Sequence, residues 1–161
     1  MLETTSRHVH VFDLAVDATS EPVLRQIAAV RLDASRELHE VASFVRFVAP
    51  DPGGTEPGAV SLATALQAFG RFVGDEGALL SYGDEAPWLA RSCARAGLPC
   101  PVDARRFGDA APLLEKALAA ATERALAPFS GVAGPAAPHD ALHDARCVAR
   151  MLRWLHARGG L

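Results

Sequence analysis

The segment HVHVFDLAVD, residues 8–17, constrains the fold more than any other part of the chain. Its side chains alternate between two faces, and both faces are mainly apolar, with valines on one and Phe12 and Leu14 on the other. A strand with two apolar faces is typical of the centre of a sheet that is covered on both sides. Asp13 interrupts one of these faces. A carboxylate in such a place needs a cation, a hydrogen-bond donor or access to water.

The rest of the chain predicts an α/β fold. Two strands over 23–33 and 37–49, joined by the polar turn DASR, form an antiparallel hairpin. After a Pro- and Gly-rich loop, helical spacing alternates with short apolar runs. We expect helices over 61–75, 86–98, 109–126 and 139–157, and short strands over 78–83 and 101–107. This order predicts a mixed five-stranded sheet, an antiparallel hairpin beside parallel strands, flanked by helices.

Composition narrows the class of protein. We expect one domain over residues 1–161, because half of the residues are apolar and 22% are charged. The net charge of −3 argues against a broad surface for duplex nucleic acid. The three cysteines have no pairing pattern, and no segment resembles a signal peptide or a membrane span. These features predict a cytoplasmic protein with no membrane partner; the oligomeric state is left open.

The last predicted helix carries a second carboxylate on an apolar face. Its apolar stripe includes Ala141 and Val148, and Asp144 lies three residues after the first and four before the second. A shared divalent cation would satisfy both Asp13 and Asp144, and hard oxygen ligands suit Mg²⁺ or Mn²⁺. His139, in the segment that enters this helix, is a candidate general base because the imidazole pKa lies near neutrality.

A third carboxylate is available between these two. The predicted strand at 78–83 ends at Gly83, and Asp84 and Glu85 follow it in the loop that leads into a helix. Functional sites in α/β sheets form at the carboxyl ends of strands. Asp84 (or Glu85) is therefore a candidate metal ligand, and Tyr82 is a candidate platform for a nucleobase.

Each of these residues also has an ordinary structural interpretation. Asp144 can pair with a neighbouring arginine, and Asp13 can cap a turn. His139 can begin a helix, and Asp84 and Glu85 can be solvated loop acids. The functional interpretation depends on Asp13, His139 and Asp144 occurring together.

These residues resemble the DEDDh 3′–5′ exonucleases of the ribonuclease H-like fold, and the histone-mRNA exonuclease type most of all. The resemblance covers nearly the whole chain. VFDLAV and QIAAVRLD correspond to the first motif and its hairpin, and SYGDEAPWLARSC corresponds to the second motif. HDALHDARCVARML, with His139 five residues before Asp144, matches the third motif and is the most specific of the three.

The resemblance implies roles for individual residues. Asp13 would bridge metals, Asp144 and Asp84 (or Glu85) would ligate them, and His139 would deprotonate the attacking water. Leu14, Ala15 and Tyr82 would contact the substrate. The implied chemistry is two-metal hydrolysis with up to two Mg²⁺ or Mn²⁺ ions. It would release nucleoside 5′-monophosphates from the 3′ end of single-stranded RNA or DNA.

The chain departs from the family pattern at three places. Ala15 stands where the first motif has Glu, an acid that helps to bind the metals and the terminal nucleotide. In the second motif the family Asp usually stands three residues after Gly83, where this chain has Ala86. The turn before the helix at 61–75 is shorter than usual. The sequence therefore supports two hypotheses: an exonuclease with impaired activity, or an inactive relative that binds nucleic acid or another protein.

Overall fold

A computed structural model describes residues 6–17, 23–49, 57–120 and 140–160. Its centre is a five-stranded sheet with the order β3-β2-β1-β4-β5. Strands β1, β2 and β3 pair antiparallel, whereas β4 and β5 continue the sheet in parallel with β1. The strands are β1 His8–Val16, β2 Leu24–Asp33, β3 His39–Phe47, β4 Leu79–Ser81 and β5 Phe107–Asp109. The predicted mixed five-stranded sheet is confirmed.

The described helices flank this sheet. They are α1 Leu62–Val73, α2 Glu85–Arg95, α3 Ala111–Ala120 and α5 Ala141–His156, with short 3-10 turns at Ala34–Arg36 and Ala104–Arg106. Ser61, the first residue of the predicted helix range, is the N-cap of α1, and its hydroxyl accepts a hydrogen bond from the Thr64 amide. In these described ranges, every helix is too short or too polar to span a membrane.

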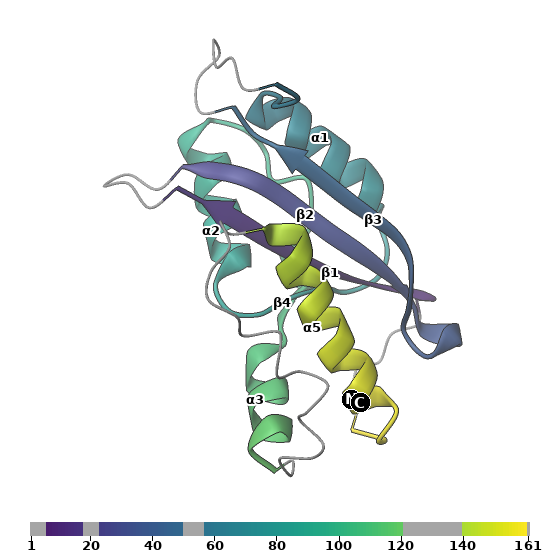
Figure 1. Cartoon of the computed structure of the whole chain (residues 1–161). Helices are drawn as coiled ribbons and strands as arrows, with labels where there is room; N and C mark the ends of the chain where they lie inside the picture. Colours follow the sequence, from purple (N-terminus) through teal and green to yellow (C-terminus); the bar gives the residue numbers. More distant parts are fainter. Residues whose placement is uncertain (1–5, 18–22, 50–56, 121–139, 161) are drawn as a thin grey trace.

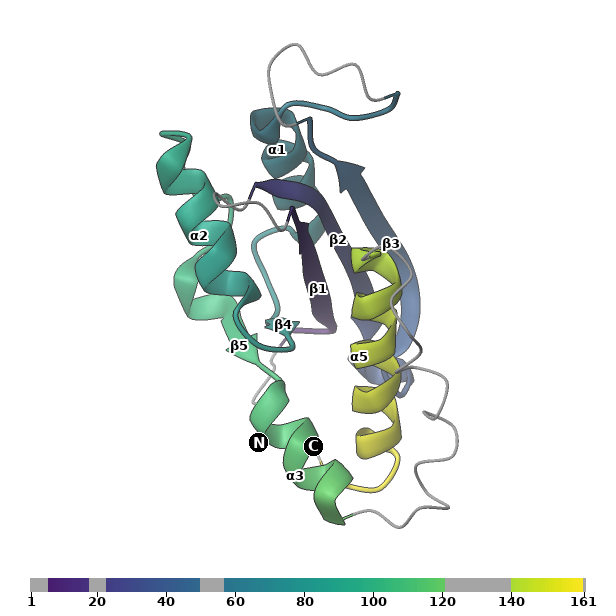
Figure 2. The same cartoon turned by 60° about the vertical axis from the view of Figure 1, so that its left-hand side comes forward.

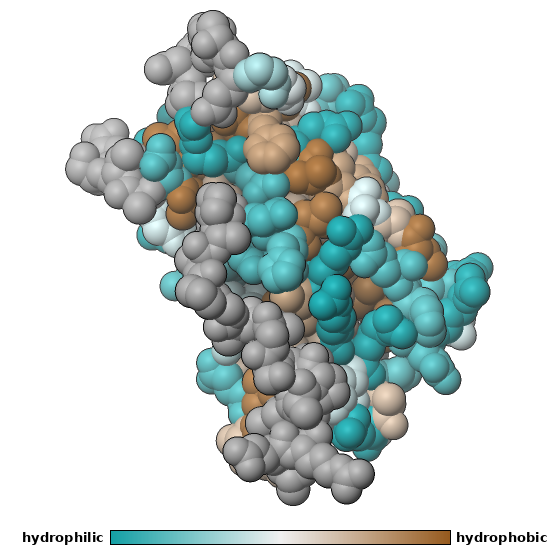
Figure 3. Space-filling view, viewed as in Figure 1, coloured by the Kyte–Doolittle hydropathy of each residue, from teal (hydrophilic) through white to brown (hydrophobic). Residues whose placement is uncertain are grey.

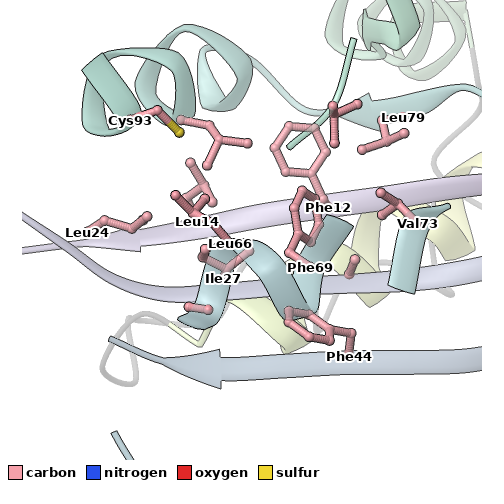
Figure 4. Close-up of a cluster of buried hydrophobic side chains, with 14 of the residues drawn as sticks. Phe12, Leu14, Leu24, Ile27, Phe44, Leu66, Phe69, Val73, Leu79 and Cys93 are labelled. Carbon is pink, nitrogen blue, oxygen red and sulfur yellow. The ribbon is translucent and has the colours of Figure 1, made fainter. Parts of the chain in front are cut away.

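Two apolar layers form the core, one on each face of the sheet. α1 and α2 cover the face that carries Phe12 and Leu14 (Figure 4). α5, with α3 beside it, covers the face that carries Val9 and Val11 (Figure 1). The view in Figure 2 places α2 and α5 on opposite sides of β1 and β2. The expectation that β1 is covered on both faces is therefore confirmed.

The outward side of α5 is polar. His143 and Arg150 are exposed there, and hydrophilic side chains cover this part of the surface (Figure 3). Toward the sheet the same helix buries mainly small and aliphatic side chains: Ala141, Ala145, Val148, Ala149, Leu152 and Leu155. This one-sided burial is what the spacing of its apolar residues predicts.

Three boundaries differ from the sequence prediction. The last strand is β5 at Phe107–Asp109, because residues 104–106 form a 3-10 turn and the run before it is not a strand. Glu85 is not in a loop but is the first residue of α2. The helix predicted over 109–126 is α3 within the described residues, and its final part lies outside them.

Candidate active site

Asp13 lies near the carboxyl end of β1, on the face that α5 covers. It pairs across the strands with Ala28 of β2, and only 7% of its surface is exposed. Alternation along β1 places it on the same face as Val9 and Val11, two and four residues before it. Burial on an apolar face penalises the charged form of a carboxyl group, so Asp13 needs partners that balance its charge.

The turn from β4 into α2 brings Glu85 to Asp13. Gly83 occupies this turn with φ of +99°, a conformation that side chains other than glycine rarely adopt. Glu85 follows in the first turn of α2 and is half-buried. Glu85 raises the pKa of Asp13 through its charge and through a side-chain hydrogen-bonding interaction. Asp84 lies one residue earlier, at the helix N-cap, and is exposed.

Asp109 fixes this turn from the neighbouring strand. At the end of β5, its Oδ1 accepts hydrogen bonds from the Gly83 amide at 3.0 Å and the Ala111 amide at 2.8 Å. Its negative charge also contributes to raising the pKa of Glu85, after the larger effect of burial. Sequence reasoning assigned Asp109 only to the start of a helix. Its position at the carboxyl end of a parallel strand was the signal that could have identified it.

Asp144 approaches the same place from α5. It is half-buried one turn into the helix, and its amide donates to the Asp140 carbonyl at 3.0 Å. Its charge is one of the influences that raise the pKa of Asp13. Three elements, β1, α2 and α5, thus each bring one carboxyl group to this place.

Burial and neighbouring negative charges together raise the pKa values of this cluster. Burial first, and then the charges of Glu85 and Asp144, raise the pKa of Asp13 to about 8. Burial also raises the pKa of Glu85, although the backbone at the start of α2 acts in the opposite direction. At neutral pH, Asp13 therefore holds a proton that its ordinary pKa would not allow. Perturbation of this kind is common at functional sites.

The same three carboxyl groups are a candidate ligand set for a hard divalent cation. Its donors are all carboxylate oxygens, which Mg²⁺ and Mn²⁺ prefer. Glu85 Oε2 is buried and receives no hydrogen bond within the described ranges. Within those ranges, no group of three His, Cys, Asp or Glu side chains is already arranged to hold a metal ion. Cation binding would therefore require the Asp13 proton to leave and the three side chains to close up.

Ala15 is buried beside this cluster. It is 7% exposed and packs with Ala28 of β2 and Ala141, the first residue of α5. Because side chains on one strand face repeat every two residues, Ala15 lies next to Asp13 on that face. The start of α5 therefore lies directly against the position where the family motif has its acid.

The other predicted site residues lie in different surroundings. Tyr82 is 39% exposed, and its hydroxyl donates to Glu115 of α3 at 3.1 Å. Leu14 lies on the opposite face of the sheet from Asp13, inside the core beneath α1 and α2 (Figure 4). His139 lies outside the described residues. Of the candidates Asp84 and Glu85, it is Glu85 that meets Asp13.

Comparison with solved structures finds this fold in 3′–5′ exonucleases. The nuclease domain of 3′hExo, a DEDDh family member bound to rAMP, aligns with a TM-score of 0.73 at 14% identity, over 96% of this chain and 94% of that chain. A 3′-exonuclease that recognises the 3′ end of the histone mRNA stem-loop aligns at 0.73 and 12% identity, over 97% of this chain and 65% of that chain. The zinc-bound E. coli ExoI–ssDNA complex aligns at 0.68 and 14% identity, over 96% of this chain and 41% of that chain.

These similarities establish the fold as that of the DEDDh exonucleases, with the ribonuclease H-like sheet predicted from the sequence. The chain spans nearly all of the 3′hExo nuclease domain but less than two thirds of the longer proteins. No family model matches the sequence. No curated protein matches it either.

Proposed function

We propose that this chain is a metal-dependent 3′–5′ exonuclease of single-stranded nucleic acid with reduced activity. The observation that carries the proposal is the electrostatic coupling of Asp13 to Glu85 and Asp144, three carboxyl groups from three separate elements. Structural neighbours that include complexes with rAMP and with single-stranded DNA support the substrate class. The products would be nucleoside 5′-monophosphates released from a 3′ end.

The three carboxylates would supply the oxygen ligands for Mg²⁺ or Mn²⁺. A divalent cation at such a site polarises a water molecule and stabilises the leaving oxygen of the phosphodiester. Asp13 must lose its proton before it can act as a ligand, so cation binding and proton release would occur together. His139, in the segment just before α5, would accept the proton of the attacking water.

Reduced activity follows from the position of Ala15. The motif acid is absent, and α5 packs directly against the alanine in its place. Three carboxylates carry less negative charge than the four of the complete motif. Of two divalent cations at the site, the second would therefore bind more weakly. Loss of one preorganised charged group typically reduces an enzymatic rate by orders of magnitude.

The same observation favours a second candidate function. An inactive relative would keep the fold and bind single-stranded nucleic acid, or another protein, without cleaving it. The two functions differ in one measurable property, which is cation-dependent shortening of a strand from its 3′ end.

The test uses 5′-labelled single-stranded RNA and DNA with Mg²⁺ or Mn²⁺. We expect slow 3′ shortening that Asp144→Asn and Glu85→Gln abolish, and that a 3′-phosphate on the substrate blocks. Asp84→Asn is the matched control, because Asp84 is exposed and adjoins Glu85 in sequence. Shortening that survives Asp144→Asn would indicate a contaminating nuclease. Strand binding without shortening, at every cation concentration, would favour the inactive relative.

A further inference from the structure

Gln26 is a buried polar side chain beside the candidate site. It pairs with Ala15 across β1 and β2, and only 5% of its surface is exposed. Both ends of its amide group are directed to the start of α5. Its Oε1 accepts a hydrogen bond from the Ala141 amide at 2.9 Å, and its Nε2 donates to Asp140 Oδ1 at 3.5 Å.

Asp140 completes the arrangement as the N-cap of α5. Its Oδ1 accepts hydrogen bonds from the amides of Leu142 at 3.0 Å and His143 at 3.4 Å. The first amides of a helix have no partner within the helix. Gln26 and Asp140 together therefore satisfy the amides of Ala141, Leu142 and His143, and the Asp140 carboxylate also suits the positive end of the helix.

Asp144 follows this arrangement within the first turn of α5. Asp144 is one turn along α5 from Asp140, and its amide donates to the Asp140 carbonyl. On the sheet side, Ala15, Ala28 and Ala141 pack together, with Val45 and Leu142 against them. The Gln26 amide is thus a polar connection between β2 and the helix end that carries Asp144.

We infer that Gln26 is a positioning residue of the candidate site, which fixes the start of α5 on the sheet beside Ala15 and so holds Asp144 toward Asp13. This inference rests on the proposed function, because it assigns Gln26 to the site where Asp144 would act. Both halves of the amide are needed. Leucine or methionine would leave the Ala141 amide without an acceptor, whereas an ionised glutamate would repel Asp140.

The first test measures, in the metal-free protein, how strongly Gln26 protects the amides at the start of α5. Amide exchange is followed by NMR in wild type, Gln26→Met and Gln67→Met, the last being a matched control on the exposed side of α1. We expect Ala141 to exchange ~10-fold faster in Gln26→Met, which corresponds to the loss of one buried hydrogen bond. β1 amides should keep their protection. Unchanged exchange at Ala141, or an equal increase throughout β1, would overturn the inference.

A second variant covers the case in which Gln26→Met does not fold. Gln26→Glu keeps an acceptor for the Ala141 amide but cannot donate to Asp140 when ionised. We expect faster exchange at Leu142 and His143 with little change at Ala141. Equal protection of all three amides in this variant and in wild type would count against a role for the Gln26–Asp140 hydrogen bond.

The second test asks whether the Gln26 hydrogen bonds affect cation binding at the candidate site. Mn²⁺ affinity is measured from the EPR signal of free Mn²⁺, with protein that is fully folded by circular dichroism. We expect Gln26→Met to weaken Mn²⁺ binding ~3- to 10-fold while Gln67→Met leaves it unchanged. A purely structural role would lower the melting temperature without changing this affinity. If wild type binds no Mn²⁺, the proposed function fails, and the exchange experiment still decides whether Gln26 holds α5.

Discussion

Replacing Asp13 with asparagine should stabilise the metal-free protein, and the gain should grow with pH. Asparagine has the shape of protonated aspartic acid and keeps an N–H donor toward Glu85, but it has no charge. The raised pKa of Asp13, about 8, means that the folded protein holds this proton more tightly than the unfolded chain does. Asp13 therefore contributes fully to stability below pH ~4, and this contribution is lost as the pH rises through about 8.

The size of the effect follows from the same pKa. Each tenfold change in proton affinity is worth ~1.4 kcal/mol, so moving the pKa from 3.8 to about 8 corresponds to at most ~6 kcal/mol above pH 8. Glu85 and Asp144 can move apart and admit water, and an effective dielectric constant of ~20 is usual even at buried sites. We therefore expect a gain of ~2–3 kcal/mol at pH 8.5, or ~5–10 °C in melting temperature for a chain of this length.

The assay is thermal unfolding of wild type and Asp13→Asn in EDTA between pH 4.5 and 8.5. The two melting curves should nearly coincide at pH 4.5 and separate as the pH rises. Added Mn²⁺ at pH 8.5 should raise the melting temperature of wild type and leave that of Asp13→Asn almost unchanged. A variant less stable than wild type at pH 8.5 in EDTA, or a difference that does not depend on pH, would refute the electrostatic argument.

Three further perturbations test other parts of the structure. Asp33→Asn should lower the melting temperature at pH 7, and the difference should narrow as the pH falls below ~4, because hydrogen bonds from Arg7 hold the pKa of Asp33 well below its usual range. Arg106→Met should cost ~2 kcal/mol in the free energy of unfolding, measured with urea, because its guanidinium donates to four backbone carbonyls, that of Val73 at the end of α1 and those of Gly74, Glu76 and Gly77 after it. Arg105→Met, at an exposed ion pair, should leave that free energy almost unchanged. Ala15→Glu should lower the free energy of unfolding by ~2–3 kcal/mol and should not speed strand shortening, whereas Ala15→Ser should change that free energy by less than ~1 kcal/mol. A glutamate variant that is as stable as wild type and shortens strands faster would contradict the packing at this position.

The fold and the burial of two candidate site residues were predictable because the periodicity of a segment reflects which of its residues are buried. Alternation along 8–17 identified a strand covered on both faces, and Asp13 was conspicuous as the charged residue on an apolar face. Helical spacing placed Asp144 at the edge of the buried side of α5 in the same way. These inferences depend only on the local pattern and on the cost of burying charge, and both can be read from one segment at a time.

The other residues of the candidate site are brought together by contacts between separate elements. The periodicity of a single segment gives no information about such contacts. The choice between Asp84 and Glu85 follows from α2 beginning one residue earlier than its apolar pattern indicates. Asp109 and Gln26 act on backbone amides that belong to distant segments, 26 and 115 residues away in the chain. Short strands such as β5 have too few residues for an alternating pattern, so the carboxylate at its end was assigned to a helix.

The packing around Ala15 changes the interpretation of the missing motif acid. A missing motif acid suggests a site that one substitution could restore. The alanine, however, packs against Ala28 and Ala141, and Gln26 beside it makes its hydrogen bonds to the helix that the alanine supports. A glutamate at this position would meet the close-packed start of α5. It would also add a negative charge beside two carboxylates, those of Asp13 and Asp140. The alanine, the glutamine and the start of α5 therefore form one interdependent arrangement, so restoring the acid would require changes at all three.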